Sequence, residues 1–400
     1  MRRYHAPDPW LILVTLFLVA FGLIMVSSAS VVESFQVTGS NTYYFVRQLI
    51  FALIGLPIWF FLQRWDYHRF KPLATIALLV SLGLLVAVFI PGIGHEAGGS
   101  HRWIGAGDLT LQVTEVLKVG LVIYLAYWFD KKGNRVADWY LTFLPFVLLM
   151  LVIGGLIIAE PDMGTTAVIA GIAGAMYFAA GADIKHIGIA LVGALVAGWG
   201  LIKMAPYRAA RWLTFLNPAS DPLGSSYHIN QALIALGSGG LFGLGFGHSR
   251  QKFNFLPEAS SDSIFAVIGE ELGLLGVLFF VILPLAIFVW RGLAVAKNAP
   301  DRFGRLLALG VTVWIGWQAV INIGAISGLM PLTGVPLPFI SQGGTSLVFA
   351  MIGAGILLNI SRQTTGERGY EDPFSWWWNI WSRITNTISR AEHPGKRSRR

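Results

Sequence analysis

Acidic and basic side chains that could do chemistry are concentrated between residues 95 and 271 of this 400-residue chain. A carboxylate can take a proton from a hydroxyl group, and it can also bind a divalent metal ion. Basic side chains beside it can stabilise the negative charge that develops on a leaving phosphate or pyrophosphate. The residues that could do this chemistry are Arg102, Glu115, Lys118, Glu160, Asp162, Arg208, Arg211, Glu258, Asp262, Glu270 and Glu271.

Four of these residues could instead hold helices together. Glu115 and Lys118 are three residues apart, so a helix places them on one face, where they can pair. The pair could contact a substrate, or it could simply join its helix to a neighbour. Glu270 and Glu271 lie in an apolar run, where carboxylates can act as buried contacts between helices. The spacing alone does not decide between these roles.

Four others have equally simple structural interpretations. Asp162 and Asp262 each precede an apolar run, and an aspartate in that place often caps a helix. Arg208 and Arg211 follow an apolar run, where arginines can bind lipid headgroups. Each of these residues could also contribute to a binding site, and both possibilities stay open.

The chain lacks the motifs for several other chemistries. It has no Cys, which excludes disulfides and thiolate chemistry. It has neither a phosphate-binding Gly-x-x-x-x-Gly-Lys-Ser/Thr loop nor a Gly-x-Ser-x-Gly nucleophile motif. His228 and His248 have no second ligand at a zinc-binding spacing. We therefore expect neither a zinc site nor a nucleotide-binding loop.

The composition decides which kind of element must position these residues. Hydrophobic residues make up 55% of the chain and charged residues only 12%. A soluble domain carries about 25% charged residues. This composition excludes a soluble enzyme, a disordered chain and a fibrous repeat, and it indicates an integral membrane protein.

Apolar runs of the length that crosses a bilayer recur ten times. The expected fold is an all-α integral membrane protein, a bundle of ten transmembrane helices. The runs lie near residues 10–29, 45–63, 72–91, 111–129, 139–159, 164–181, 184–204, 263–290, 304–327 and 343–361.

Lys and Arg residues are distributed unequally between alternate loops. One side of the membrane, with the C-terminal tail, receives 21 of the 29, and the other side receives 8. By the positive-inside rule, both termini are cytoplasmic. The net charge of +8 then reflects topology, and we do not expect nucleic-acid binding. The candidate residues fall on the outer side.

Three regions depart from the pattern of spans and short loops. Residues 205–262 form a large extracytoplasmic loop between the seventh and eighth spans, and long loops are usually functional. Its run Gly237–Gly245 should be flexible or tightly turned. Residues 331–346 contain prolines and Gly343-Gly344, which indicate a broken or re-entrant segment. The expected domains are a membrane domain, residues 1–362, and a tail, residues 363–400, with a Trp-rich interfacial helix near 373–390.

Eight short motifs occur along the chain. They are Arg102-Trp103, Leu111-Gln112-x-x-Glu115-x-x-Lys118, Glu160-Pro161-Asp162-x-Gly164-Thr165, Tyr207-Arg208-x-x-Arg211, Asn217-Pro218-x-x-Asp221-Pro222-x-Gly224, Leu256-Pro257-Glu258-x-x-x-Asp262, Gly269-Glu270-Glu271-Leu272-Gly273 and Gly334-Val335-Pro336-Leu337-Pro338-Phe339-Ile340-Ser341. In this order they resemble the motifs of one known family, the SEDS proteins (shape, elongation, division and sporulation), which include FtsW and RodA. The similarity extends over about residues 10–362.

The resemblance implies a function. SEDS proteins polymerise lipid II into peptidoglycan glycan strands at the outer face of the bacterial cytoplasmic membrane and release undecaprenyl pyrophosphate. They act with a class B penicillin-binding protein, and we expect other divisome or elongasome membrane proteins as partners. The family's essential aspartate falls on Asp262, as a general base or as a ligand of Mg²⁺ or Mn²⁺. The residues expected to bind substrate are Arg102, Glu115, Lys118, Glu160, Asp162, Arg208, Arg211, Glu258 and Ser341.

The branch of the family is less sharply indicated. Pro206-Tyr207-Arg208 and Gln251-Lys252-Phe253 favour the FtsW branch, hence a role in cell division, whereas Gly237–Gly240 is more typical of the RodA branch. Residues next to Glu115 and Asp262 differ from the family's usual ones, which affects the expected shape of the outer cavity.

Two functions of other classes also stay open. A lipid II flippase or transporter usually carries ionisable residues near the midplane of the membrane, whereas here they collect at the outer boundary. A divisome scaffold would leave the cluster of charged residues without a purpose. The sequence therefore favours the glycosyltransferase.

Overall fold

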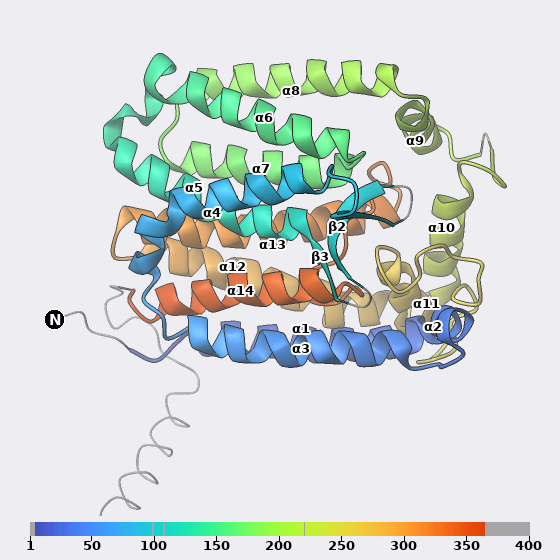
Figure 1. Ribbon diagram of the computed structural model, residues 1–400. Coiled ribbons are helices and arrows are strands. Elements are labelled where there is room, and N and C mark those ends of the chain that lie inside the picture. The colour runs from blue at the N-terminus through green and yellow to red at the C-terminus, as the bar shows by residue number, and fades with distance from the viewer. Residues whose placement is uncertain (1–4, 98–99, 107–108, 220, 365–400) are drawn as a thin grey trace, which may run out of the picture.

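The computed structural model describes residues 5–97, 100–106, 109–219 and 221–364. Its long helices lie side by side (Figure 1). They are α1 (Pro9–Ala29), α3 (Tyr43–Leu62), α4 (Phe70–Ala87), α5 (Val113–Lys132), α6 (Leu144–Ala159), α7 (Met163–Ala179), α8 (Ile184–Met204), α12 (Leu283–Asn298), α13 (Arg302–Ile326) and α14 (Gly344–Ser361).

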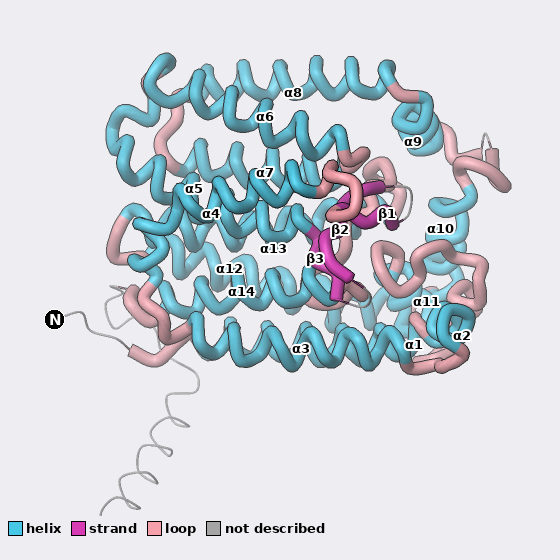
Figure 2. Tube along the Cα trace, in the orientation of Figure 1, coloured by secondary structure: helices cyan, strands magenta, loops and turns pink. Residues whose placement is uncertain are grey.

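Shorter elements connect these helices. They are the α-helices α2 (Val31–Thr38), α9 (Pro206–Leu216), α10 (Tyr227–Gly239) and α11 (Ile264–Val277), the 3₁₀ turns η1 (Tyr67–Arg69) and η2 (Gly133–Ala137), the π turns η3 (Trp139–Phe143) and η4 (Leu278–Ile282), and the strands β1 (Gly94–Ala97), β2 (Ser100–Ala106) and β3 (Leu109–Gln112). Figure 2 shows the strands at the same end of the bundle as α2, α9 and α10, which we call the sheet end. The opposite end carries the N-terminus.

Among the described residues, eight helices are long and apolar enough to cross a membrane, with η3 counted as part of α6, and α11 and η4 as part of α12. Two further helices lie where spans were predicted: α7, which has only 17 residues, and α5, which carries Glu115 and Lys118 in its first turns. The chain is thus a multi-pass, mostly helical membrane protein, while ten spans remain a prediction.

Helix α13 lies at the centre of the bundle, between α5, α7, α12 and α14. Trp314 and Ile315 are buried on different faces of it, because a helix that is apolar all round can bury every face. Helix α8 is the opposite case. It contacts only α7 and α9 appreciably, and His186 is its single buried residue. Its apolar surface is therefore free to face lipid.

A small antiparallel sheet, in the order β1-β2-β3, precedes α5. Trp103 on β2 lies opposite Gln112 on β3, and β3 leads directly into α5 at Val113. The expectation of an all-α fold is wrong in this detail. The strands have only four to seven residues, and Gly105 lies inside β2, so they give no sustained alternation of apolar and polar residues.

The large loop predicted at 205–262 contains two helices, α9 and α10, so it is not a single irregular segment. Figure 1 shows α10 running across the ends of the bundle helices. The predicted span 263–290 is also divided, because Gly273 has φ 70° and ψ −175° and kinks α11.

Backbone hydrogen bonds are exchanged at this kink between α11 and the loop after α10. In an unbroken helix, the amides of Leu274 and Leu275 would bond within α11. Here they donate to the carbonyls of Gly240 and Leu241, at 2.9 and 3.1 Å. In return, loop amides at 244 and 245 donate to the carbonyls of Glu270 and Glu271. The first three residues of the Gly-rich run end α10, and the rest, from Gly240 to Gly245, is tightly turned, which is one of the two forms expected for it.

The predicted tail helix near 373–390 lies outside the described residues. The segment from 331 to 337 has no regular secondary structure, as expected for the broken segment, and it returns the chain to α14.

Candidate functional site

Asp262 lies at the sheet end, two residues before α11, in the wall of a cavity of about 170 Å³. Three parts of the chain form the rest of the wall. Helix α9 contributes Arg211, helix α10 contributes His228, and the segment after α13 contributes Met330 and Gly334. The cavity therefore brings a carboxylate, a guanidinium and an imidazole together.

The backbone around Asp262 is fixed from α13. The Nδ2 atom of Asn322 donates to the carbonyl of Asp262 at 2.8 Å and to the carbonyl of Val335 at 2.7 Å. Gly334 stands beside the carboxylate with φ 69°, and a Cβ there would lie 3.6 Å from Asp262 Oδ2. The loop of Asp262 and the broken segment are thus held against each other.

The surroundings of Asp262 disfavour its charge. Burial raises the pKa of this carboxyl to about 7, and the nearby Glu258 carboxylate adds to the rise. The Arg211 guanidinium opposes the shift. A carboxyl with a pKa near neutrality can accept a proton from a hydroxyl group and lose it again between turnovers.

His228 was considered in the sequence only as a possible metal ligand, and the structure places it in the same cavity wall. Its Nε2 lies 2.6 Å from the hydroxyl of Ser263, and that hydroxyl lies 3.5 Å from Asp262 Oδ1. Burial lowers the pKa of His228, so the ring is neutral at pH 7. Nothing in the spacing of residues 228 and 263 along the chain could have indicated this contact.

Glu115 and Lys118 form a buried ion pair in the first turns of α5. Lys118 Nζ lies 2.8 Å from Glu115 Oε1 and 2.8 Å from Oε1 of Gln318 on α13. The side chains of the pair are at most 3% exposed. The pairing predicted from their spacing is confirmed, and the pair joins α5 to α13.

Arg102, Glu160 and Asp162 form a second group, at the junction of α6 and α7. Arg102 on β2 donates to the carbonyls of Glu160 and Pro161 at 3.2 and 2.7 Å and lies 3.5 Å from Asp162 Oδ2. Asp162 caps α7 by accepting from the Thr165 amide at 2.9 Å. Burial and the charge of Asp162 raise the pKa of Glu160 to about 8.

Arg208, Glu258 and Ser341 occupy different positions. Arg208 is buried and donates to carbonyls at the ends of α6 and α8. Glu258 is exposed and accepts from the Ser261 hydroxyl at 2.7 Å. Ser341 is buried, and its hydroxyl accepts from the Leu337 amide at 2.8 Å. Of the predicted site residues, Arg211 and Asp262 line the cavity, and the others are not part of its wall.

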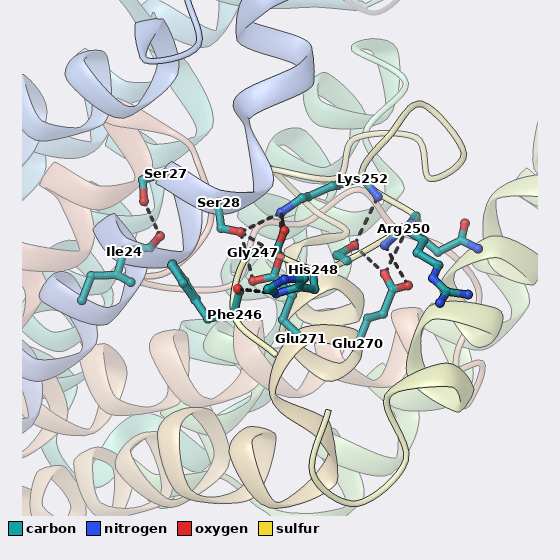
Figure 3. A network of polar contacts seen from close by, with 12 residues as sticks. Ile24, Ser27, Ser28, Phe246, Gly247, His248, Arg250, Lys252, Glu270 and Glu271 are labelled. Atoms are coloured by element: carbon teal, nitrogen blue, oxygen red, sulfur yellow. Dashed lines mark hydrogen bonds and ion pairs between the residues drawn. The ribbon is translucent and has the colours of Figure 1, made fainter. Parts of the chain in front are cut away.

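Glu270 and Glu271 belong to a separate buried network at the kink of α11 (Figure 3). Lys252 Nζ lies 2.9 Å from Glu271 Oε1 and 3.0 Å from the hydroxyl of Ser28 on α1. Glu270 accepts from the amide of Arg250 at 3.0 Å. These carboxylates hold the loop after α10 against α1 and α11, which matches their interpretation as contacts between helices.

The residues around Asp262 do not form a ready ligand set for a metal ion. In the part of the chain that the structure describes, no group of three or more His, Asp or Glu side chains is arranged to hold one. Glu258 influences the charge of Asp262 from nearby, and His228 lies in the same cavity wall. We therefore derive no chemical step through a resident metal.

Apolar helices of spanning length, with a cavity at one end that places a carboxylate beside a guanidinium, define a multi-pass membrane protein with a polar site at one end of its bundle. Residues 9–366 match the family model described as the cell cycle protein family FtsW/RodA/SpoVE. The chain belongs to this family, the SEDS proteins, and the resemblance drawn from its motifs is confirmed.

Relatives and solved structures agree with this assignment. Stage V sporulation protein E of Bacillus subtilis is 40% identical over 359 residues, which cover 89% of this chain and 97% of the relative. A probable peptidoglycan glycosyltransferase FtsW of Trichlorobacter lovleyi is 41% identical over 355 residues, 88% of this chain and 93% of that one.

Two solved structures share the fold. RodA of Thermus thermophilus, a rod-shape-determining protein, is 28% identical with a TM-score of 0.66, and the match covers 90% of this chain and 99% of RodA. A chain of a peptidoglycan synthase complex, described for its coordination of polymerization and crosslinking, is 27% identical with a TM-score of 0.74, covering 91% of this chain and all of that one.

Proposed function

We propose that this protein is a peptidoglycan glycosyltransferase that polymerises lipid II, with Asp262 as the general base. The glycosyltransferase class rests on the family and on relatives named for this activity. The observation that supports the role of Asp262 is its place in the cavity wall, with a raised pKa and with Arg211 in the same wall.

In the proposed reaction, the 4-hydroxyl of an acceptor GlcNAc attacks C1 of the terminal MurNAc of the growing strand. Its proton passes to Asp262, the new C1–O bond forms, and the bond from C1 to the pyrophosphate oxygen breaks. Undecaprenyl pyrophosphate leaves with the bonding electrons. Because pyrophosphate is already a good leaving group, the site needs positive charge on that side more than a second acid.

Arg211 is the best candidate for that positive charge. It is exposed and lines the cavity with Asp262. Lys118 is already paired inside the bundle, and Arg102 and Arg208 bind backbone carbonyls. We propose that Arg102 and Arg208 reach the substrate only after a rearrangement. The cavity is smaller than the roughly 300–1,000 Å³ of common ligand pockets, so it would admit only the reacting part of the sugar.

The proposed setting follows the family and the charge distribution. The sheet end would face outward from the bacterial cytoplasmic membrane, with both termini cytoplasmic. A class B penicillin-binding protein would be the partner, and similarity to a chain of a peptidoglycan synthase complex supports a partnered enzyme. The role would be septal wall synthesis in division, which several FtsW-named relatives support.

Other roles for the same activity are a RodA-type elongation function and, because of the similarity to stage V sporulation protein E, a sporulation function. Depletion in the source organism separates them. Filaments would support division, round cells would support elongation, and defects confined to spores would support sporulation.

The direct test is polymerisation of purified lipid II by the full chain in proteoliposomes. Wild type should form glycan strands, whereas Asp262→Ala and Asp262→Asn should form none. Each protein is assayed both with and without a cognate class B penicillin-binding protein. A series of Mg²⁺ and Mn²⁺ concentrations shows whether a divalent cation takes part. Normal strand synthesis by Asp262→Asn would refute the base role, and failure of folded, partner-bound wild type would favour a flippase or scaffold.

A further inference from the structure

Two amide side chains on α13 face the broken segment between α13 and α14. Gln318 and Asn322 are four residues apart, so they lie on one face of the helix. Gln318 Nε2 donates to the carbonyl of Pro336 at 2.9 Å, and Asn322 Nδ2 donates to the carbonyl of Val335 at 2.7 Å. We call these two side chains the amide ladder.

At the Gln318 end, the amide ladder contacts the buried ion pair on α5. Gln318 Oε1 accepts from Lys118 Nζ at 2.8 Å and from Trp314 Nε1 at 2.9 Å. Lys and Trp side chains can only donate, so the oxygen of Gln318 must face them and its nitrogen must face Pro336. The ion pair therefore fixes the orientation of the first amide.

At the Asn322 end, the amide ladder contacts the loop that carries Asp262, the proposed base. Besides Val335, Asn322 Nδ2 donates to the carbonyl of Asp262 at 2.8 Å. Both partners are acceptors, so the nitrogen of Asn322 must face them. One amide group thus joins the loop that carries Asp262 to the segment that carries Gly334, the residue beside its carboxylate.

The segment from 331 to 337 has no helix or strand to hold it in place. Side chains that bind its carbonyls help to hold its position, and the ladder binds two of them in succession. Lys118, Gln318 and Asn322 are each at most 3% exposed. Buried as they are, these residues are better placed to act on the shape of the cavity than on a substrate within it.

We propose that Gln318 and Asn322 are positioning residues, through which the Glu115–Lys118 pair sets the place of Asp262 in the cavity. This inference rests on the proposed function and deepens it, because it gives Glu115 and Lys118, which the sequence placed among the substrate-binding residues, a positioning role instead. Hydrogen bonds in a buried network strengthen one another, so the loss of one member weakens the rest.

The test compares Asn322→Ala and Gln318→Met with wild type in the lipid II assay. A displacement of the base by about 1 Å can cost about 100-fold in rate. Each variant should therefore lower kcat by about 10- to 100-fold and change the KM for lipid II by less than about twofold. Asn322→Ser, which keeps one donor, should give an intermediate kcat.

Thr312→Val is the matched control. Thr312 is also buried on α13, but its hydroxyl bonds to the carbonyl of Ala308 in its own helix. This variant should keep the kcat of wild type. A kcat in Asn322→Ala equal to that of the control, or a raised KM with unchanged kcat, would overturn the proposal.

Hydrogen exchange supplies a second readout that does not depend on activity. In the ladder variants, amides of residues 258–263 and 331–340 should exchange faster, while those at the opposite end of the bundle stay unchanged. Unchanged exchange in both segments would overturn the ladder. If exchange becomes faster in the ladder variants but wild type makes no glycan strands, the structural role of the ladder is supported and the proposed function is wrong.

Discussion

At the level of single residues, the charge on Asp262 depends on its burial and on two charged neighbours, Glu258 and Arg211. Glu258 raises its pKa, Arg211 lowers it, and burial contributes most. His228 is bonded to the adjacent Ser263 and is neutral at pH 7. A change in one of these neighbours should therefore shift the pKa of Asp262 and change its protonation near physiological pH.

This arrangement predicts a pH dependence for the reaction. A base works in its deprotonated form, so kcat should rise through pH 7 and fall about tenfold per unit well below it. Glu258→Gln removes a carboxylate that raises the pKa of Asp262, and it should move the profile to lower pH. Arg211→Gln should move it to higher pH.

The measurement is kcat for strand synthesis between pH 5 and 9, with lipid II in excess. Thr312→Val serves here too as the unshifted control. Shifts of the two variants in the same direction would contradict the assignment of the profile to Asp262.

The roles of single residues could be predicted from the sequence only where the partners are close along the chain. The pairing of Glu115 with Lys118 and the capping by Asp162 depend on spacings of three residues, which the sequence displays directly. The contacts of Asp262 with Asn322 and of His228 with Ser263 join distant segments. A single sequence contains no periodic signal for such contacts.

At the level of elements, the kink in α11 depends on glycine. Gly273 has a positive φ, and a Cβ on it would lie 2.3 Å from the backbone nitrogen of Gly243. Gly273→Ala should therefore lose about 1–3 kcal/mol or more of stability. Gly154→Ala on α6 is the matched control, since its Cβ would meet nothing within 4 Å.

The control should be neutral or gain about 0.5–1 kcal/mol, as alanine usually does over glycine in a helix. The measurement is the thermal unfolding midpoint of each purified variant in the same detergent. If Gly273→Ala unfolds at the temperature of Gly154→Ala, the kink does not require glycine.

The long helices were predictable because a continuous apolar run of spanning length rarely forms anything except a membrane helix. The short elements at the sheet end were not. Helices α9 and α10 mix apolar and polar residues over only 11 and 13 positions, and the strands have 4 to 7. Such segments are stabilised by packing on the bundle, which a local pattern does not record.

At the level of the whole molecule, the chain should sit in the membrane with its sheet end outward. Because it has no Cys, single cysteines report on exposure without background. Leu223, 89% exposed between α9 and α10, and Asn134, exposed in the turn between α5 and α6, lie near opposite ends. In intact cells, a membrane-impermeant maleimide should label Leu223→Cys.

Asn134→Cys should react only after the membrane is permeabilised. Equal labelling of both variants in intact cells would refute the proposed orientation. Labelling of Asn134→Cys alone would show that the orientation is the reverse. Both side chains are exposed in short connecting segments, so neither substitution should disturb the fold.

The exchange of backbone hydrogen bonds at Gly273 also affects how the protein is made. The partners of Leu274 and Leu275 are Gly240 and Leu241, which leave the ribosome about thirty residues earlier. By the time α12 is ready to enter the bilayer, the kink before it can already be closed by nearby chain. The backbone groups that the break in α11 leaves without partners in the helix can thereby form hydrogen bonds with nearby chain, before α13 and α14 have been synthesised.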